Sequence, residues 1–212
     1  DAIRQGLRTF DTTFFQAPGR MNVFNEHPFK VLFDYGHNAH AVGVMADLAQ
    51  RLDVSGRRIV VVAGPGDRRD EDLREIAQAV AGRFDHYIVR RDDSLRGRDG
   101  DEVPRIIATE LKAKGVPDSA ITVIPDEQEA IDAALKMGRA GDLLLVFADA
   151  LVRSWKQIIK FRPEGAPEAP QPREKLPEMR VVEPAAEEAI HAAMEGMVRD
   201  ERGITIAREG DD

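Results

Sequence analysis

The stretch FDYGHNAHAV carries more polar chemistry than a plain turn requires. A hydrophobic run ends at Asp34, and a glycine, two histidines and Asn38 precede a helical pattern. Asp34 could accept hydrogen bonds from hydroxyl groups or position a metal ion through water, and His37 could hydrogen-bond a phosphate. The simpler interpretation is that Asp34 and Asn38 only cap the following helix. The spacing by itself does not separate the two.

A second candidate is AGPGDRRDED, residues 63–72, in which Arg68 and Arg69 come just before a predicted helix. Basic side chains at a helix N-terminus can hold an anion. The phosphate loop G-x-x-x-x-G-K-[ST] does not occur in the sequence. The favoured interpretation is an ordinary turn in which the arginines pair with Asp67, Asp70 and Glu71.

The third candidate is RRDDSLRGRDGDE, residues 90–102. Asp92 and Asp93 offer carboxylates to a cation, and Arg96 and Arg98 offer guanidinium groups to a carboxylate, so the loop could hold a zwitterion. A solvated loop whose charges pair among themselves is the slightly favoured alternative. The acidic residues that begin several helices are expected to be solvated, and the histidine spacing gives no metal site.

Alternating elements must position these loops. Buried strands are expected at residues 30–35, 57–64, 85–91, 120–126 and 142–149, and helices at 38–52, 70–84, 101–115, 126–138 and 151–161. This alternation predicts an α/β, Rossmann-like fold with a mostly parallel sheet and helices on both faces. Ligands of such sheets bind at the carboxyl ends of the strands, where all three candidate loops lie. A further short strand is expected at residues 21–24.

Composition excludes several classes of function. The formal net charge is −8, which argues against nucleic-acid binding. The absence of cysteine excludes disulfides, thiolate catalysis and zinc–thiolate sites. No apolar run is long enough to span a bilayer, and no signal peptide is visible, so we expect a cytoplasmic protein without membrane contact.

The composition changes after Phe161. Residues 163–182 are rich in proline and glutamate and predict an extended linker. Residues 183–212 predict a tail with one amphipathic helix, after Pro184, and room for a short strand.

Several motifs together resemble the Mur ligase superfamily, which includes folylpolyglutamate synthases. The segments GLRTF, PGRMNVF and VLFDYGHNAHAV are similar to its junction between central and C-terminal domains, although Ala39 stands where many members have proline. The segments GPGDRRDEDLREI, DDSLRGRDGDEVP and GDLLLVFADALVRSWKQIIKF resemble the C-terminal part of the cyanophycin synthetases. The resemblance covers residues 1–161.

The resemblance implies a domain organisation and an activity. Residues 1–28 would end the central ligase domain and link it to a C-terminal Rossmann-like domain at 29–162. Members join an amino acid to a carboxylate with ATP through an acyl phosphate. For cyanophycin synthetases the amino acid is arginine and the acceptor is a poly-aspartate. ATP and Mg²⁺ would be held mainly by the central domain, outside this chain.

The resemblance also implies roles for single residues. Arg20 would reach the nucleotide phosphates and Asp34 the ribose. A crevice would be lined by His37, Asn38 and Arg68. The incoming amino acid would meet four side chains, Asp92, Asp93, Arg96 and Arg98. We expect the isolated chain to be inactive and the full enzyme to be a homo-oligomer; the alternative is a binding or scaffold domain that kept the fold without catalysis.

Overall fold

The computed structural model describes residues 13–163, 197–200 and 203–206. The chain divides into two compact units, residues 1–166 and 167–212. The larger unit holds a six-stranded sheet, and the smaller one holds a two-stranded sheet.

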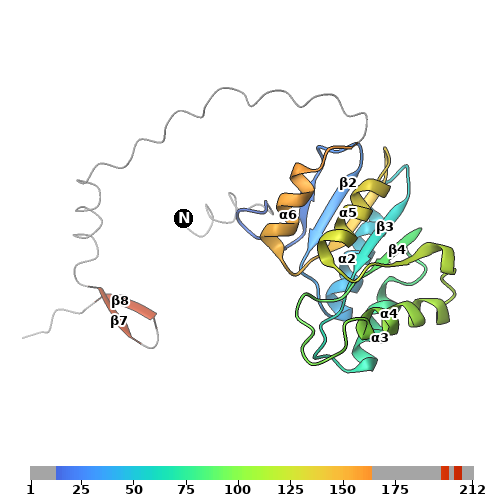
Figure 1. Cartoon of the computed structure of the whole chain (residues 1–212). Coiled ribbons are helices and arrows are strands. Elements are labelled where there is room, and N and C mark those ends of the chain that lie inside the picture. The colour runs from blue at the N-terminus through green and yellow to red at the C-terminus, as the bar shows by residue number, and fades with distance from the viewer. Residues whose placement is uncertain (1–12, 164–196, 201–202, 207–212) are drawn as a thin grey trace, which may run out of the picture. The chain divides into compact units, whose positions relative to one another are not determined.

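The large sheet is parallel except at one edge (Figure 1). The strand order is β1-β2-β6-β3-β4-β5, and only β1 runs antiparallel to its neighbour. The strands are β1 (Asn22–Phe24), β2 (Lys30–Asp34), β3 (Arg58–Val62), β4 (His86–Val89), β5 (Ile121–Val123) and β6 (Leu143–Phe147). The predicted parallel α/β sheet and the short first strand are both confirmed.

Helices cover both faces of this sheet, as the sequence predicts. The helices are α2 (Ala39–Arg51), α3 (Asp70–Val80), α4 (Glu102–Ala113), α5 (Glu127–Met137) and α6 (Leu151–Lys160), with a 3₁₀ turn η1 (Asp118–Ala120) before β5. The first three pack on one face and the last two on the other. Alternate residues of β2 enter the two cores: Leu32 faces α2, whereas Val31 and Phe33 face the other layer.

The segment before β2 belongs to the second of these cores. The ring of Phe14 stacks on Trp155 of α6, with centroids 5.1 Å apart and planes 2° from parallel. Gly19, in a left-handed conformation with φ of 67°, turns the chain towards β1. The sheet thus includes a strand that precedes residue 29, the predicted start of the C-terminal domain. That boundary stays a prediction.

An ion pair between the partly exposed Arg57 and the buried Asp142 lies at the opposite, amino-terminal end of the strands. Asp142, 3% exposed, accepts hydrogen bonds from the backbone N–H groups of Arg57 and Arg139 and from the Arg57 guanidinium at 2.7 Å. These bonds outweigh the effect of burial and lower the pKa of Asp142.

The smaller unit contains an antiparallel hairpin of β7 (Met197–Asp200) and β8 (Gly203–Ile206). The tail therefore does contain strand structure. The helix predicted after Pro184 and the predicted linker, apart from residue 163, lie outside the described residues. No helix in the described part of the chain is both long and apolar enough to cross a membrane.

Candidate functional site

The carboxyl ends of the five parallel strands bring the candidate loops to one edge of the sheet. Because β6 lies between β2 and β3, the loop after β6 sits in the middle of this edge. It separates the turn after Asp34 from the loop that follows β4. Asp149, just after β6, is thereby placed between the two groups of predicted site residues.

The turn after β2 is held by the polar side chains that drew attention to it. Asp34 accepts hydrogen bonds from the N–H groups of Met21 (2.9 Å) and Gly36 (2.7 Å). Met21 has a left-handed φ of 52°, which is uncommon for a residue other than glycine. Asn38 caps α2 by accepting from Ala41 N–H at 3.0 Å. Asp34 and Asn38 thus both make hydrogen bonds that hold the local structure. The Asp34 carboxylate still has lone pairs that can accept hydrogen bonds from a ligand.

His37, Asn38 and Arg68, which the resemblance assigns to one crevice, lie close together. They line a cavity of about 330 Å³ between the start of α2 and the start of α3. Its wall also includes Arg69 and Asp72, which pair with each other at 2.8 Å. Two helix N-termini and Arg68 favour an anion there, whereas Asp72 neutralises Arg69 and the wall also contains the carboxylate of Glu75. Arg69 therefore does pair with a carboxylate, but its partner is Asp72 and not Asp67, Asp70 or Glu71, which the sequence interpretation names.

Arg20 lies beside this turn. Its guanidinium carbon is 5.7 Å from the centroid of the Tyr35 ring, and its side chain is exposed. The contact keeps the arginine near the carboxyl edge without burying its charge.

In the loop after β4, the two predicted arginines have different environments. Arg98, 16% exposed, is enclosed by Asp70 at 2.8 Å and Glu102 at 2.6 Å, and it also donates to the carbonyls of Gly66 and Arg68. Arg98 thereby connects the loop after β4 to the loop after β3. Arg96, 40% exposed, sits in a left-handed conformation (φ 47°). It contacts Asp67 at 3.1 Å and Asp92 at 3.5 Å.

The two predicted carboxylates also differ. Asp93 is exposed and pairs with Arg153 of α6 at 2.6 Å. Asp92 is 7% exposed. Burial, together with a hydrogen bond to Asp149 and the charge of Asp149, raises the pKa of Asp92 to about 7. Burial also acts to raise the pKa of Asp149, but the charge of Arg90 and hydrogen bonds from Asp92 and Arg90 outweigh it and lower that pKa.

A buried charged cluster supports this region, and the sequence reasoning missed it. Arg90 and Glu127 are 1% and 0% exposed and lie 3.1 Å apart. Arg90 also bonds Asp149 at 2.9 Å and the Phe147 carbonyl at 2.9 Å. Glu127 accepts from the N–H groups of Asp149 and Ala150 and from the Ser154 hydroxyl.

The cluster corrects the expectation that acidic residues at helix starts are solvated. Glu127, the first residue of α5, is fully buried because it satisfies the backbone at the start of α6. The only sequence signal was Arg90 directly after the apolar run YIV, where an arginine at a buried strand end requires a partner.

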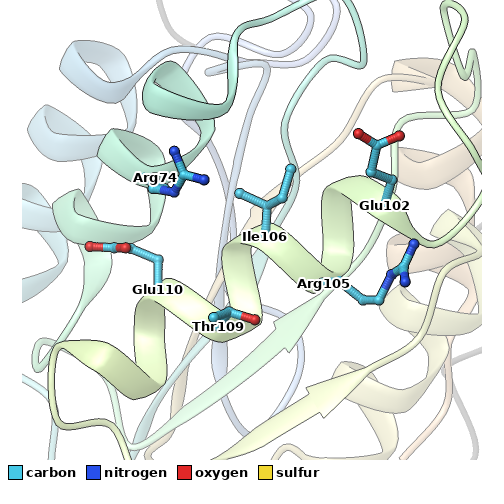
Figure 2. A pocket seen from close by; sticks show the side chains of 6 residues that line it. All are labelled: Arg74, Glu102, Arg105, Ile106, Thr109 and Glu110. Carbon is cyan, nitrogen blue, oxygen red and sulfur yellow. The ribbon is translucent and has the colours of Figure 1, made fainter.

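A second cavity, about 230 Å³, lies over α4 and contains none of the predicted site residues (Figure 2). Arg74 reaches it from α3, and Glu102, Arg105, Ile106, Thr109 and Glu110 line it from α4. Within the described residues, no group of three or more histidine, aspartate or glutamate side chains is arranged to hold a metal ion.

Comparison with known proteins places this geometry in a family. The profile of the Mur ligase family, glutamate ligase domain, matches residues 19–150. Cyanophycin synthetase from Nostoc sp. is 43% identical over 169 residues, which are 76% of this chain and 18% of that protein. The enzyme of the same name from Geminocystis herdmanii is 40% identical over 161 residues, with the same coverage of each chain. The chain thus spans about a fifth of the length of these relatives.

Solved structures show the same fold. Mycobacterium tuberculosis folylpolyglutamate synthase matches with a TM-score of 0.56 and 21% identity, over 77% of this chain and 36% of that one. A UDP-N-acetylmuramoyl-L-alanyl-D-glutamate–2,6-diaminopimelate ligase matches with a TM-score of 0.54 and 23% identity, over 74% and 36% of the two chains. The profile match over residues 19–150 agrees with the parallel sheet and with the motifs at its carboxyl edge. The chain therefore belongs to the Mur ligase family, and within that family it is similar to the C-terminal region of cyanophycin synthetases.

Proposed function

We propose that this chain forms the C-terminal domain of an ATP-dependent ligase. The ligase joins an amino acid, which we take to be arginine, to the side-chain carboxylate of an aspartate in a poly-aspartate acceptor. The observation that carries the proposal is the division of the carboxyl edge into two halves of different charge. The cavity at His37 and Arg68 favours an anion, and the region at Asp92 and Asp149 favours a cation. The likeness to cyanophycin synthetases supports the choice of substrates.

In the reaction, the acceptor carboxylate attacks the γ-phosphate of ATP, so an acyl phosphate forms and ADP leaves. The amine of the incoming amino acid then attacks the acyl carbon, and inorganic phosphate departs as the amide forms. In this proposal the nucleotide binds in the half of the site that contains His37, Asn38 and Arg68. Arg20 reaches its phosphates, and Asp34 reaches its ribose. Mg²⁺, when bound with the nucleotide, would neutralise phosphate charge. We assign its protein ligands mainly to another domain of the ligase, as the resemblance to the superfamily implies.

The amino acid is placed at the loop that follows β4. Asp92 and Asp93 face its guanidinium group, and Arg96 faces its carboxylate. Arg98 takes a supporting role because Asp70 and Glu102 already hold its guanidinium. The chain alone is expected to be inactive, because the sequence has no phosphate loop.

The test uses a chimera, in which residues 13–163 replace the matching segment of the Nostoc sp. cyanophycin synthetase. Asp34→Ala should raise the KM for ATP more than that for arginine, and Asp92→Ala should do the reverse. A lost hydrogen bond to a charged group is worth about 1.5–3 kcal/mol, or roughly ten- to a hundred-fold in either KM. If Asp34→Ala only lowers the Tm and leaves both KM values unchanged, its role is limited to the turn. If Asp92→Ala uses arginine as well as the wild type does, the amino-acid site lies elsewhere.

A further inference from the structure

The α4 cavity, the space of about 230 Å³ between Arg74 of α3 and the side chains of α4, begins beside the candidate site (Figure 2). Glu102, at one end of it, is the first residue of α4 and pairs with Arg98 at 2.6 Å. Arg98 also donates to two carbonyls of the loop after β3, so this end touches the carboxyl edge of the sheet. From Glu102 to Glu110 the cavity follows α4 for about 12 Å, at about 1.5 Å per residue. The α4 cavity therefore leads away from the candidate site without being part of it.

The two guanidinium groups of the α4 cavity have N–H donors to spare. Arg105 is exposed, and within the residues that the structure describes it makes no ion pair; its Nε donates to the Asp101 carbonyl at 3.2 Å. Arg74 is 42% exposed and lies 3.5 Å from Asp70 and 3.7 Å from Glu71. Exposed pairs at such distances contribute little. Both guanidinium groups can therefore donate to a carboxylate from another molecule.

The two carboxylates of the α4 cavity can accept from a ligand as well. Glu102 is 38% exposed, and Glu110, 15% exposed, accepts from Gln78 at 2.9 Å and lies 3.7 Å from Lys114. A carboxylate has about four lone-pair sites, so each of them keeps room for a further donor. Figure 2 shows an arginine and a glutamate at each end of the cavity, with Ile106 between the ends. The cavity thus presents both signs of charge around an apolar centre.

We propose that the α4 cavity binds the polymer that the ligase lengthens, through aspartate units that already carry arginine. The proposal rests on the proposed function, which makes such units. After the amide has formed, each unit carries one free carboxylate and one guanidinium and has no net charge. The carboxylate fits the spare donors of Arg74 and Arg105, and the guanidinium fits the acceptors of Glu102 and Glu110. Bare poly-aspartate would leave both glutamates unused and would be repelled by a chain whose net charge is −8.

Binding there would keep the growing polymer next to the candidate site. An extended peptide covers about 12 Å with about three or four residues, so the cavity has room for a few units. A polymer held at a second point meets the site at a raised effective concentration, without any new contact to the reacting atoms. The α4 cavity would therefore favour acceptors that have already been lengthened over short ones.

The first arm of the test measures binding to this chain without turnover. Peptides of about five aspartate units, with or without arginine on each side chain, are titrated into the ¹⁵N-labelled chain at neutral pH. The arginylated peptide should shift the backbone amide signals of α4 between Glu102 and Glu110, and the bare peptide should bind more weakly. The double variant Arg74→Ala with Arg105→Ala should raise the Kd about three- to twenty-five-fold, because two exposed ion pairs are lost. Arg51→Ala, an exposed arginine of α2, is the matched control and should leave the Kd unchanged.

Two results of this arm would overturn the proposal. One is an unaltered chain whose α4 signals do not respond to the arginylated peptide or that binds the bare peptide equally well. The other is a double variant that binds the arginylated peptide as tightly as the unaltered chain does.

The second arm places the double variant in the chimera. Arg74 and Arg105 lie outside the candidate site, so turnover on an acceptor too short to reach the α4 cavity should not change. The KM for a long arginylated acceptor should rise by the same factor as the Kd, and an unchanged KM would refute the role of the cavity. A chimera without arginine-dependent turnover on either acceptor would instead refute the proposed function, and the binding arm would still decide whether the α4 cavity holds the polymer.

Discussion

Glu127→Ala tests the buried cluster that supports the candidate site. The variant removes the carboxylate 3.1 Å from the Arg90 guanidinium and the acceptor of two backbone N–H groups at the start of α6. Breaking a buried ion pair costs about 3–5 kcal/mol. Arg90 keeps Asp149 as a second partner at 2.9 Å, so we expect the lower end of that range, about 3 kcal/mol.

The free energy of unfolding is measured in urea through the fluorescence of Trp155, the only tryptophan in the chain. A loss of about 3 kcal/mol corresponds to a Tm roughly 6–12 °C lower for a chain of this size. Glu129→Ala is the matched control, since the same residue type two positions along α5 is exposed and should cost less than about 0.5 kcal/mol. Glu127→Gln keeps an acceptor for the backbone and should fall between the two. Equal stability of Glu127→Ala and Glu129→Ala would refute the described cluster.

Three further predictions concern stability. Asn38→Ala removes the cap of α2 and should cost about 1 kcal/mol, which Asn38→Asp should restore, as a Tm comparison would show; no loss would mean that the cap is dispensable. The pKa of Asp92 is raised to about 7, so the folded chain binds more protons than the unfolded chain between about pH 4 and pH 7. The free energy of unfolding therefore falls as pH rises through this window, and urea titrations should show a flatter pH profile for Asp92→Asn. Asp142 has a lowered pKa, so its contribution disappears as pH falls below about 4, and Asp142→Asn should show a smaller acid-induced drop in Tm than the unaltered chain.

Local patterns in the sequence were sufficient for the elements of the fold. The run IVVV predicts a strand covered on both faces, and β3 is buried between both helix layers. Asn38 at the start of an apolar helical pattern predicts the cap that α2 shows. These features depend on neighbours a few residues away, where propensity and periodicity act.

The central position of β6 depends instead on contacts between distant segments. Pairing of β6 with β2 and β3 brings Asp149 beside Arg90, 59 residues earlier in the chain. No local pattern contains that separation. The burial of Glu127 could not be predicted for the same reason. A glutamate in the first turn of a helix interacts favourably with the helix dipole whether its side chain is solvated or, as here, buried under the loop after β6.

The most direct test of the account is phosphate release from ATP by the chimera carrying residues 13–163, with a poly-aspartate acceptor and with or without arginine. We expect phosphate release that depends on arginine and that falls about ten-fold or more at sub-saturating arginine in Asp92→Ala. A folded chimera that releases phosphate at the same rate with and without arginine would contradict it.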